Sequence, residues 1–476
     1  MIIIDELQKF DLIVIGSGSG LDVANAATQN GLKVAVIERD RMGGTCLNRG
    51  CIPSKLLIHS ADVAEIIKSA NLFGIEVDGL SVNFQKIVER VNAITDHSSD
   101  QIKNAFKDIE NPKLFAKECK FVGEKTILIG DNEKITAEKI LIASGTRPEI
   151  PKKIEGLEGS SYITSDEALR LKKQPRVITF IGGGYITCEL AHFFGSLGTE
   201  INIVQLGDVL IPNEDEEISK KFTEVFSKKY NVYLGYETES VSKWKNDDNG
   251  GDDDPTFHII AKNSTNGNSL ELDSDQLLVA VGRIPNSDIL DIEKAGVKVD
   301  EKGFIITDEY LETNVKGIFA LGDAVGRYQF KHNANHESQY AFNNILHPNR
   351  KVAVDYTAMP HAIFSSPQVA GVGFTEQELK KKNNIDYERS VYSYINTGMG
   401  EAIEDRDGFV KFLVDGKSRK ILGCHIIGSH ASILIHEVLV AMRAGDGTID
   451  NISRTIHIHP ALSEVIARAA SYDIKR

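Results

Sequence analysis

The sequence predicts an α/β fold made of two strand–turn–helix–strand units and a C-terminal α+β domain. Residues 11–38 read as an apolar strand, a glycine-rich turn, a helix of small residues and a second apolar strand. The same order of elements returns at 176–205. From about residue 351, strands and helices alternate with no further glycine-rich turn. Two units so far apart indicate two nucleotide-type domains rather than a repeat of short period.

The bulk composition narrows the class of protein. A chain of 476 residues is too long for one hydrophobic core, so we expect two to four domains. A net charge of −14 offers no phosphate-neutralising surface, which argues against a nucleic-acid partner. No apolar run approaches about 18 residues, so no membrane span is expected. The start, MIIIDELQKF, has no basic region or cleavage site, so we expect no signal peptide and a cytoplasmic protein.

The first glycine-rich turn has the features of a dinucleotide site. Gly16, Gly18 and Gly20 follow a strand directly, where they permit a tight turn and close approach of a pyrophosphate to the backbone. Glu38 ends the next strand, 22 residues after Gly16, where a carboxylate can bind ribose hydroxyls. Leu21 stands where the third glycine of the usual motif falls, so helix–strand packing there must be adjusted.

The second glycine-rich turn contains Gly182 and Gly184 and departs from the motif at Thr187. Gln205 ends the following strand, where an acidic residue would mark NAD. A glutamine can bind both ribose hydroxyls but does not repel a 2′-phosphate. No Arg or Lys lies at 201–219 to bind such a phosphate. The balance favours NAD over NADP.

The segments between these turns give a coarse order of elements. Residues 55–110 have helical patterns, and 114–142 read as short strands. Residues 246–255, NDDNGGDDDP, are polar and breaker-rich, which predicts a solvated hairpin loop. Residues 275–323 return to strands.

Two of the five cysteines are close enough in sequence for redox chemistry. Cys46 and Cys51 are separated by four residues, enough loop for a disulfide. Pro53 suits the first turn of a helix, so Cys51 is expected at a helix N-terminus, where a thiolate is stabilised. The other three are expected to be small core residues: Cys119, Cys188 and Cys424.

The run GGTCLNRGCIPSK at 43–55 resembles the redox motif of the dihydrolipoamide dehydrogenase and glutathione reductase family, the class I pyridine nucleotide–disulfide oxidoreductases. The resemblance covers nearly the whole chain. Further motifs follow in the family's order: ASGTRP at 143–148, GGGYITCE at 182–189, VGRIPN at 281–286, GIFALGD at 317–323 and HIHPALSE at 457–464.

The resemblance implies two Rossmann-like dinucleotide-binding domains and a C-terminal dimerisation domain in a homodimer. An FAD-binding domain would comprise residues 1–150 and 276–350. An NAD(P)-binding domain would span 151–275, and the dimerisation domain 351–476. The expected cofactors are FAD and NAD, and no metal is expected.

The same resemblance implies the roles of the thiol-exchange residues. Cys46 would be the interchange thiol that attacks the substrate, and Cys51 the thiol that faces the flavin and forms a charge-transfer complex. His459 would be the acid–base, oriented by the carboxylate of Glu464. The base would reach the cysteine pair of the partner chain.

Other motif positions are expected to bind the cofactors. Lys55 and Glu189 resemble an ion pair near the flavin and nicotinamide rings. Asp323 resembles the carboxylate that holds the flavin's ribityl chain. Three further positions complete the expected cofactor site: Ser144, Gly145 and Gly282.

The missing phosphate-binding residues favour an NAD-linked enzyme, hence dihydrolipoamide as the small dithiol substrate. Such an enzyme could serve a 2-oxoacid dehydrogenase or glycine cleavage complex. The alternative is a reductase of low-molecular-weight disulfides, because residues 329–339 and the IHPAL run resemble mycothione reductase. A mercuric reductase is disfavoured because the tail ASYDIKR has no cysteine pair. A flavin-bearing scaffold or redox sensor without turnover is disfavoured, because such a protein would not need all of the residues that thiol exchange requires. This chain has them together: Cys46, Cys51, His459 and Glu464.

Overall fold

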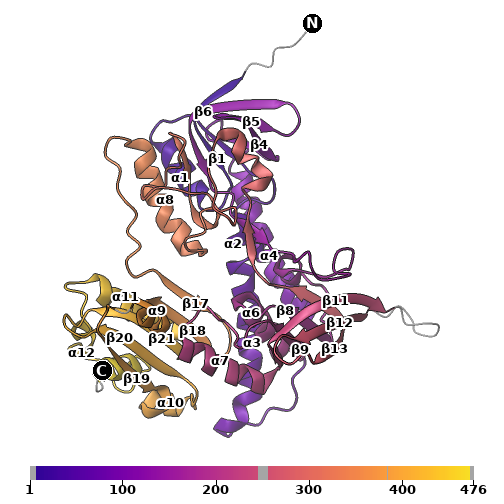
Figure 1. Ribbon diagram of the computed structural model, residues 1–476, viewed down its shortest axis with the longest axis vertical. Helices are drawn as coiled ribbons and strands as arrows, with labels where there is room; N and C mark the ends of the chain where they lie inside the picture. The colour runs from indigo at the N-terminus through magenta and orange to yellow at the C-terminus, as the bar shows by residue number, and fades with distance from the viewer. Residues whose placement is uncertain (1–6, 245–255, 383, 472–476) are drawn as a thin grey trace. The chain divides into compact units, whose positions relative to one another are not determined.

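The structure is a computed structural model that describes residues 7–244, 256–382 and 384–471. The predicted hairpin loop at 246–255 lies outside the described residues, as does most of the N-terminal apolar start. The chain divides into two compact units (Figure 1). The first unit comprises residues 1–56, 86–149 and 282–355, and the second comprises 57–85, 150–281 and 356–476.

The first unit is built on a seven-stranded sheet. Its order is β3-β2-β1-β6-β5-β4, with β16 pairing β6. Strands β1, β2, β3, β6 and β16 are parallel, whereas β4 and β5 continue the sheet antiparallel from β6. The strands are β1 (Gln8–Ile15), β2 (Val34–Ile37), β3 (Lys113–Phe115), β4 (Cys119–Gly123), β5 (Thr126–Ile129), β6 (Glu133–Ile142) and β16 (Ile318–Ala320).

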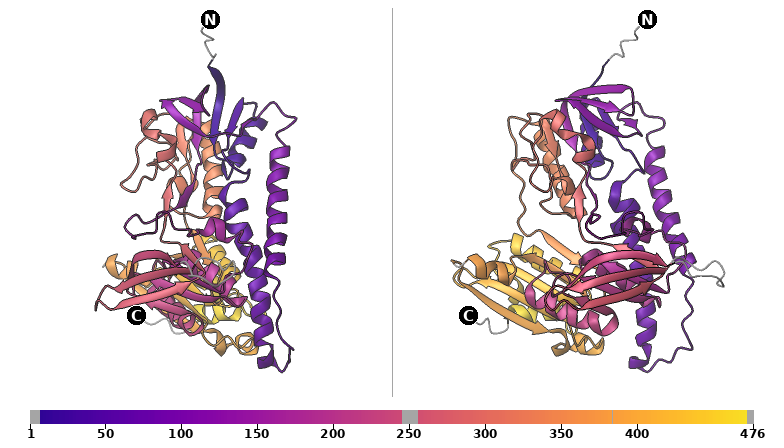
Figure 2. Two further views of the ribbon diagram at one scale, coloured as in Figure 1. Left: turned by 90° about the vertical axis from the view of Figure 1, so that its right-hand side faces the viewer. Right: turned by 45° about the vertical axis from the view of Figure 1, so that its right-hand side comes forward.

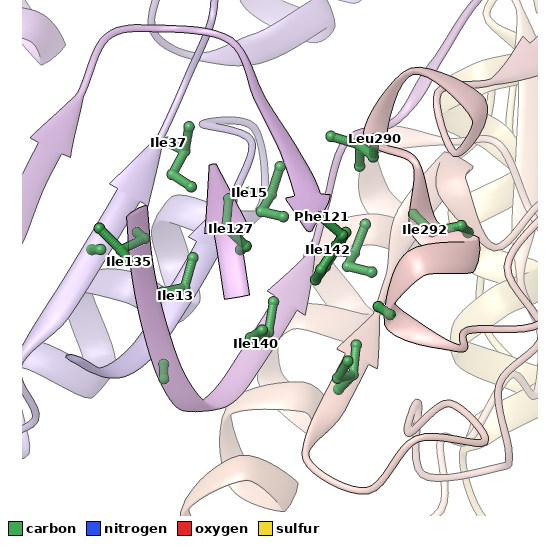
Figure 3. Packing of buried hydrophobic residues seen from close by; sticks show 14 of the residues in the cluster. Ile13, Ile15, Ile37, Phe121, Ile127, Ile135, Ile140, Ile142, Leu290 and Ile292 are labelled. Atoms are coloured by element: carbon green, nitrogen blue, oxygen red, sulfur yellow. The ribbon is translucent and has the colours of Figure 1, made fainter. Parts of the chain in front are cut away.

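One face of this sheet packs on a core rich in isoleucine, shown in Figure 3. Ile13 and Ile15 of β1 alternate toward it, and Ile140 and Ile142 of β6 lie beside them with Phe121 of β4. All five are at most 4% exposed. β-Branched residues suit this buried sheet because their restricted side chains pack well on a pleated surface.

The remaining elements of the first unit include a second, two-stranded sheet in which β15 pairs β7 antiparallel. These strands bring the predicted ASGTRP and VGRIPN motifs side by side. The elements are β7 (Thr146–Pro148), β15 (Arg283–Pro285), α1 (Gly20–Gln29), α2 (Gly44–Arg49), α8 (Lys331–Leu346), and the 3₁₀ turns η2 (Asp288–Leu290), η3 (Ile292–Ala295) and η4 (Gly322–Ala324). The division into units falls inside α3 (Cys51–Ser69) and α4 (Phe84–Asn104).

The second unit contains a parallel four-stranded sheet, ordered β10-β9-β8-β14, and an antiparallel sheet, ordered β11-β12-β13. Strands β11 to β13, rose-coloured, are seen from two further sides in Figure 2. The elements are η1 (Ala70–Phe73), α5 (Ser165–Ala168), β8 (Val177–Ile181), α6 (Tyr185–Ser196), β9 (Glu200–Gln205), α7 (Glu216–Lys229), β10 (Asn231–Leu234), β11 (Tyr236–Trp244), β12 (Thr256–Asn263), β13 (Ser269–Ser274) and β14 (Gln276–Val279).

The C-terminal part of the second unit is a five-stranded antiparallel sheet, ordered β17-β18-β21-β20-β19, with helices packed on it. This agrees with the predicted α+β pattern. The elements are β17 (Pro360–Ile363), β18 (Gln368–Gly373), α9 (Glu376–Lys382), β19 (Tyr387–Ser393), η5 (Tyr394–Asn396), α10 (Gly398–Ala402), β20 (Phe409–Asp415), β21 (Ile421–Gly428), α11 (Ala431–Arg443), α12 (Asp450–Ser453) and α13 (Glu464–Ser471).

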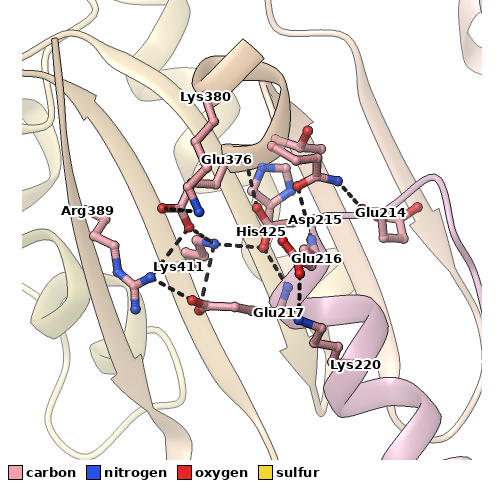
Figure 4. A network of polar contacts seen from close by, with 12 residues as sticks. Glu214, Asp215, Glu216, Glu217, Lys220, Glu376, Lys380, Arg389, Lys411 and His425 are labelled. Carbon is pink, nitrogen blue, oxygen red and sulfur yellow. Dashed lines mark hydrogen bonds and ion pairs between the residues drawn. The ribbon is translucent and has the colours of Figure 1, made fainter. Parts of the chain in front are cut away.

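A buried ion cluster links the start of α7 to this C-terminal sheet (Figure 4). Lys411 Nζ, fully buried on β20, lies 2.8 Å from Asp215 Oδ1 and 2.6 Å from Glu376 Oε2. Arg389 binds Glu217 at 2.6 Å at the edge of the cluster. The charges compensate one another, so no lone ion is desolvated.

Two expectations from the sequence need correction. The segment between the two redox cysteines, expected as a loop, contains the short helix α2. The stretch from 286 to 317, expected as strands, contains the 3₁₀ turns η2 and η3 with isolated bridges instead. Gly296 at a φ of +73° and Gly303 at a φ of +87° turn the chain within this stretch and interrupt a continuous strand.

Candidate active site

The first glycine-rich turn lies at the carboxyl end of β1. Gly16 has a φ of +104°, and a Cβ there would lie 2.3 Å from Ala143 O, so only glycine fits. A Cβ on Gly18 would meet no described atom within 4 Å. The N–H of Ser17 donates to Glu38 Oε2 at 2.9 Å, and the Ser17 hydroxyl donates to the same oxygen at 2.7 Å. Glu38 at the end of β2 therefore also shapes the turn.

Gly20 explains how the turn tolerates Leu21. A Cβ on Gly20 would lie 2.8 Å from Val14 Cγ1 and 3.1 Å from Ala143 Cβ. The close helix–strand approach is thus made at Gly20, one residue before the usual third glycine. Leu21 is free to pack into the adjoining core, where it is 9% exposed.

Three motifs converge on the carboxylate of Asp323, in the turn after β16. Thr146 Oγ1 donates a hydrogen bond to Asp323 Oδ2 at 3.2 Å and accepts one from Arg283 Nε at 2.8 Å. Burial raises the pKa of Asp323, and Arg283 and the Thr146 hydrogen bond only partly oppose this. Ser144 Oγ is buried with no hydrogen-bond partner among the described residues.

The redox cysteines lie at the starts of two successive helices. Cys46 is in α2 and half-buried, whereas Cys51 is exposed and begins α3, as the sequence predicts. Both are thiols, and their side chains are hydrogen-bonded to each other. This hydrogen bond, burial and the charge of Cys51 raise the pKa of Cys46.

The second glycine-rich turn repeats the first in the second unit. Gly182 has a φ of +104°, and a Cβ there would lie 2.5 Å from Ala280 O. Thr187 explains the departure from the motif: it is fully buried, and its hydroxyl donates to Gly182 O at 2.8 Å. The N–H of Gly183 donates to Gln205 Oε1 at 2.9 Å, which matches the contact of Ser17 with Glu38.

His459 and Glu464 form the predicted pair. His459 Nδ1 lies 3.0 Å and 3.1 Å from the two carboxylate oxygens of Glu464. The His459 side chain is 75% exposed. Its hydrogen bond and charge lower the pKa of Glu464. When Nδ1–H donates to this carboxylate, Nε2 of the neutral ring is left as a proton acceptor open to solvent.

A second histidine–glutamate pair lies in the same segment. His457 Nε2 is 2.6 Å from Glu437 Oε1 on α11, and its Nδ1 is 2.9 Å from Thr455 O. Its side chain is only 10% exposed. Hydrogen bonds at both ring nitrogens therefore hold this histidine in place.

The predicted residues fall into two groups. The first unit holds Gly16, Gly18, Gly20, Glu38, Cys46, Cys51, Lys55, Ser144, Gly145, Gly282 and Asp323. The second unit holds Gly182, Gly184, Glu189, Gln205, His459 and Glu464. The expected ion pair would join Lys55 of the first unit to Glu189 of the second, and it stays a prediction. Within its own unit, Glu189 is buried and accepts the N–H of Phe364 at 2.9 Å.

The sequence interpretation overlooked several side chains around the first site. Ser17 buttresses the glycine turn, as described above. Glu337 is fully buried on α8 and accepts the N–H of Gly322 at 2.6 Å, which fixes the residue before Asp323. Lys331, at the start of α8, donates to Ser19 Oγ at 2.8 Å. A lysine in a first helical turn was an available signal, because the helix dipole disfavours a cation there.

Comparison with known proteins identifies the family. Residues 10–338 match the pyridine nucleotide-disulphide oxidoreductase family, and 359–470 match its dimerisation domain. The chain belongs to this family, whose members use FAD and NAD(P)H.

Curated relatives match over nearly the full chain but carry different names. Mycothione reductase from Mycobacterium tuberculosis is 33% identical over 97% of this chain and 99% of the relative. Dihydrolipoyl dehydrogenase from Chlamydia trachomatis is 34% identical over 97% of this chain and 96% of the relative. A dihydrolipoyl dehydrogenase from Bacillus subtilis is 32% identical over 97% of both chains. The family is therefore shared, and the substrate differs among relatives.

A solved structure has the same fold. The HOCl-induced flavoprotein disulfide reductase RclA from Escherichia coli superimposes with a TM-score of 0.83 at 25% identity, over 97% of this chain and 100% of that chain. In the part of this chain that the structure describes, no helix is long and apolar enough to cross a membrane.

The residues of the first unit fit an FAD group. The space above Gly18 leaves room for a pyrophosphate, and the unpaired hydroxyl of Ser144 can donate a hydrogen bond. The half-buried carboxylate of Asp323 can accept hydrogen bonds from hydroxyl groups, which a ribityl chain has.

Proposed function

We propose that this chain is a dihydrolipoamide dehydrogenase, which converts dihydrolipoamide and NAD⁺ to lipoamide, NADH and a proton. The observation that carries the proposal is the combination of the hydrogen-bonded pair Cys46 and Cys51 with the exposed ring of His459 held by Glu464. A dithiol substrate needs a sulfur electrophile, which the Cys46–Cys51 pair would offer once oxidised to a disulfide, and a proton acceptor, which His459 would offer.

The residues act in a defined order in this proposal. Nε2 of His459 takes a proton from one substrate thiol, and the resulting thiolate attacks Cys46 Sγ. The Cys46–Cys51 disulfide breaks, and a mixed disulfide forms between substrate and Cys46. The second substrate thiol then attacks the substrate sulfur of that bond, and its proton passes to the departing Cys46 sulfur. This releases oxidised substrate and leaves Cys46 as a thiol and Cys51 as a thiolate. When bound, FAD supplies the two-electron transfer from the cysteine pair to NAD⁺.

We assign residues 1–150 and 276–350 to FAD binding, 151–275 to NAD(P) binding and 351–476 to a homodimer interface. The match to a dimerisation domain supports the last assignment. In such a homodimer His459 and Glu464 would serve the cysteine pair of the partner chain. Lys55 and Glu189 would pair beside the two cofactor rings.

The preference for NAD rests on charge. Gln205 is neutral, and the chain has no Arg or Lys at 201–219. A 2′-phosphate would therefore lose its water without gaining a cationic partner from this segment. This argument favours a dehydrogenase that uses NAD⁺, and its partner would be a 2-oxoacid dehydrogenase or glycine cleavage complex.

A reductase of a low-molecular-weight disulfide is the second candidate. It is favoured by the 33% identity to mycothione reductase and by the QFKHNANHESQ run at 329–339. The same residues would then run the exchange in reverse, with reduced nicotinamide as the electron donor.

A substrate panel with the purified FAD-containing enzyme separates the two candidates. We expect the highest kcat/KM with dihydrolipoamide and NAD⁺. Mycothione and other small disulfides are compared with NADH and with NADPH in parallel. A disulfide reduced with much higher kcat/KM than dihydrolipoamide is oxidised would replace the first candidate with the second.

A further inference from the structure

The loop between β9 and α7 contacts the second glycine turn through two adjacent residues, all within the second unit. The N–H of Ile211 donates to Gly183 O at 2.8 Å. A Cβ on Gly183 would lie 2.8 Å from Leu210 Cδ2, so the Leu210 side chain packs directly on the turn. Both loop residues are at most 3% exposed. The turn is therefore held by this loop as well as by Gln205.

Ile211 has a backbone conformation that its side chain disfavours. Its φ is +45°, in the left-handed region, which is unusual for a β-branched residue. Pro212 follows, and a residue before proline favours an extended backbone. The first site has a glycine at the corresponding place: Gly44 lies six residues after Glu38 and has a φ of +63°. Ile211 likewise lies six residues after Gln205. Such strain persists only where surrounding contacts impose it.

Two buried hydroxyl groups of α7 supply such contacts. Ser219 Oγ donates to Ile211 O at 2.8 Å, and the same carbonyl accepts the N–H of Glu214 at 3.1 Å. The N–H of Leu210 donates to Thr223 Oγ1 at 2.9 Å. The Thr223 hydroxyl donates in turn to Ser219 O at 2.7 Å, which orients it to accept from the loop. Both hydroxyl-bearing residues are at most 8% exposed, so a lost hydrogen bond there is not readily replaced by water.

The hydrogen bond at Gly183 O orients the peptide group that joins Gly183 to Gly184. In a trans peptide the C=O and N–H groups point to opposite sides. With the carbonyl bound to Ile211, the N–H of Gly184 points away from the loop. A Cβ on Gly184 would meet no described atom within 4 Å, so there is room beside this residue. Gly184 is also the N-cap of α6, whose N-terminus favours an anion.

We propose that Ser219 and Thr223 are positioning residues for the nicotinamide nucleotide. They hold the loop so that the carbonyl of Gly183 stays turned away from the pyrophosphate and the next N–H stays turned toward it. The proposal rests on the proposed assignment of residues 151–275 to NAD(P) binding. A glycine peptide rotates at little steric cost, so a loosened loop would let the carbonyl oxygen face and repel the phosphates.

The test measures nucleotide affinity without thiol substrate. NAD⁺ and NADP⁺ are titrated calorimetrically into the FAD-containing enzyme, and the Kd of adenosine, which has no pyrophosphate, is obtained by competition. Thr223→Val removes the hydroxyl but keeps a similar shape. It should raise the Kd of the nucleotide that binds more tightly about three- to tenfold, the effect of about one hydrogen bond. The Kd of adenosine should stay unchanged, and Thr223→Ser should keep the parent affinity.

Ser219→Ala is a milder second variant, because Ile211 O keeps the N–H of Glu214 as a donor. It should raise the Kd in the same direction. Ser390→Ala is the matched control: the Ser390 hydroxyl is 2% exposed and donates to Ala469 O at 2.6 Å, within the same unit. This control should lower the free energy of unfolding but leave the Kd unchanged.

Equal Kd values in the parent, Thr223→Val and Ser219→Ala would overturn the proposal. An equal rise for adenosine would also overturn it, as would failure of Thr223→Ser to keep the parent affinity, since either would show a structural role only. A parent enzyme that binds neither nucleotide would instead refute the proposed function. Inactivity toward dihydrolipoamide would refute only the proposed substrate, because the binding constants do not depend on turnover.

Discussion

The backbone N–H of Gly183 donates to Gln205 Oε1 at 2.9 Å, so this glutamine holds the second glycine turn as Glu38 holds the first. A Cβ on Gly183 would lie 2.9 Å from Gln205 Cδ, so the side chain packs directly on the turn. The Gln205 Nε2 atom also donates to Val209 O at 3.2 Å. The residue expected at the ribose is thus also a structural support, and a glutamate could accept the same N–H.

Nicotinamide choice tests this site. We expect the enzyme to prefer NAD(H), and Gln205→Glu to sharpen that preference by about tenfold or more, since about 1.4 kcal/mol of repulsion of the 2′-phosphate corresponds to a factor of ten. Gln205→Arg should shift the preference toward NADP(H). The measurement is kcat/KM for both cofactors in each variant. Comparable values for the two cofactors in the unmodified enzyme would contradict the NAD assignment.

The two cysteines should give opposite spectroscopic results. Cys51→Ser should bind FAD but lose the long-wavelength charge-transfer band on two-electron reduction, because the thiolate facing the flavin is removed. Cys46→Ser should show the band already in the oxidised enzyme, because Cys51 can no longer form the disulfide. Absorption spectra of the two variants check this. A band that persists in Cys51→Ser would reverse the assigned roles.

We expect His459 to accelerate turnover by as much as a general base usually does. We expect His459→Ala to lower turnover by about 10²–10⁴, and to leave FAD content and the oligomeric state unchanged. Glu464→Gln should cost less, because it keeps a hydrogen-bond acceptor for Nδ1 but removes the charge. Steady-state kinetics and size-exclusion chromatography provide the readouts. Full turnover in His459→Ala would remove this residue from the mechanism.

Mixing inactive subunits tests whether the base acts across the dimer. A heterodimer of Cys46→Ser with His459→Ala has one complete site if the base serves the partner chain, and none if it serves its own. An equal random mixture should recover about a quarter of normal activity, since half of the dimers have one working site of two. Absence of recovery, with heterodimers confirmed by mass spectrometry, would show that the base acts within its own chain.

The buried cluster of Figure 4 predicts a large effect of Lys411 on stability. Lys411→Met should lower the free energy of unfolding by about 3–5 kcal/mol, because Asp215 and Glu376 would become buried charges without their shared cation. Lys380→Met is the matched control: Lys380 also binds Glu376, at 3.2 Å, but is 57% exposed. Its loss should cost about 1 kcal/mol or less. Urea unfolding of the FAD-containing enzyme measures both.

The stability that Lys411 contributes through this cluster should decrease as the pH falls. Burial raises the pKa of Asp215, but the charge of His425 and then the hydrogen bond from Lys411 outweigh it and hold that pKa below its ordinary value. Burial also raises the pKa of Glu376, but the hydrogen bond and charge of Lys411 outweigh it in the same way. A lowered carboxyl pKa stabilises the folded chain above the ordinary carboxyl range, and this stabilisation is lost as the pH falls through the folded-state pKa. The difference between the unmodified enzyme and Lys411→Met should therefore narrow in acid. A constant difference at all pH values would contradict this account.

Much of the first site could be predicted from local sequence. A strand followed by closely spaced glycines predicts the turn at Gly16 because only glycine adopts its positive φ beside Ala143 O. Pro53 predicts a helix start near Cys51 because its fixed φ suits a first turn. The strand that ends near Glu38 follows from a short apolar run.

Only the tertiary structure decided how departures from the motifs are accommodated. Gly20 supplies the close helix–strand contact that Leu21 cannot, and Thr187 replaces a third glycine by binding Gly182 O. These solutions depend on the distance between a helix and a strand, which the one-dimensional pattern does not contain.

The sequence by itself determined the α/β class and the family, and it singled out the candidate cysteines and histidine, because these depend on residue type and on short spacings that restrict the backbone locally. The tertiary structure alone decided that Lys331 binds Ser19, 312 residues earlier, and that Lys411 sits between Asp215 and Glu376. Such contacts arise when the sheets and helices pack, since packing sets which distant charges share a low-dielectric site and must therefore compensate one another.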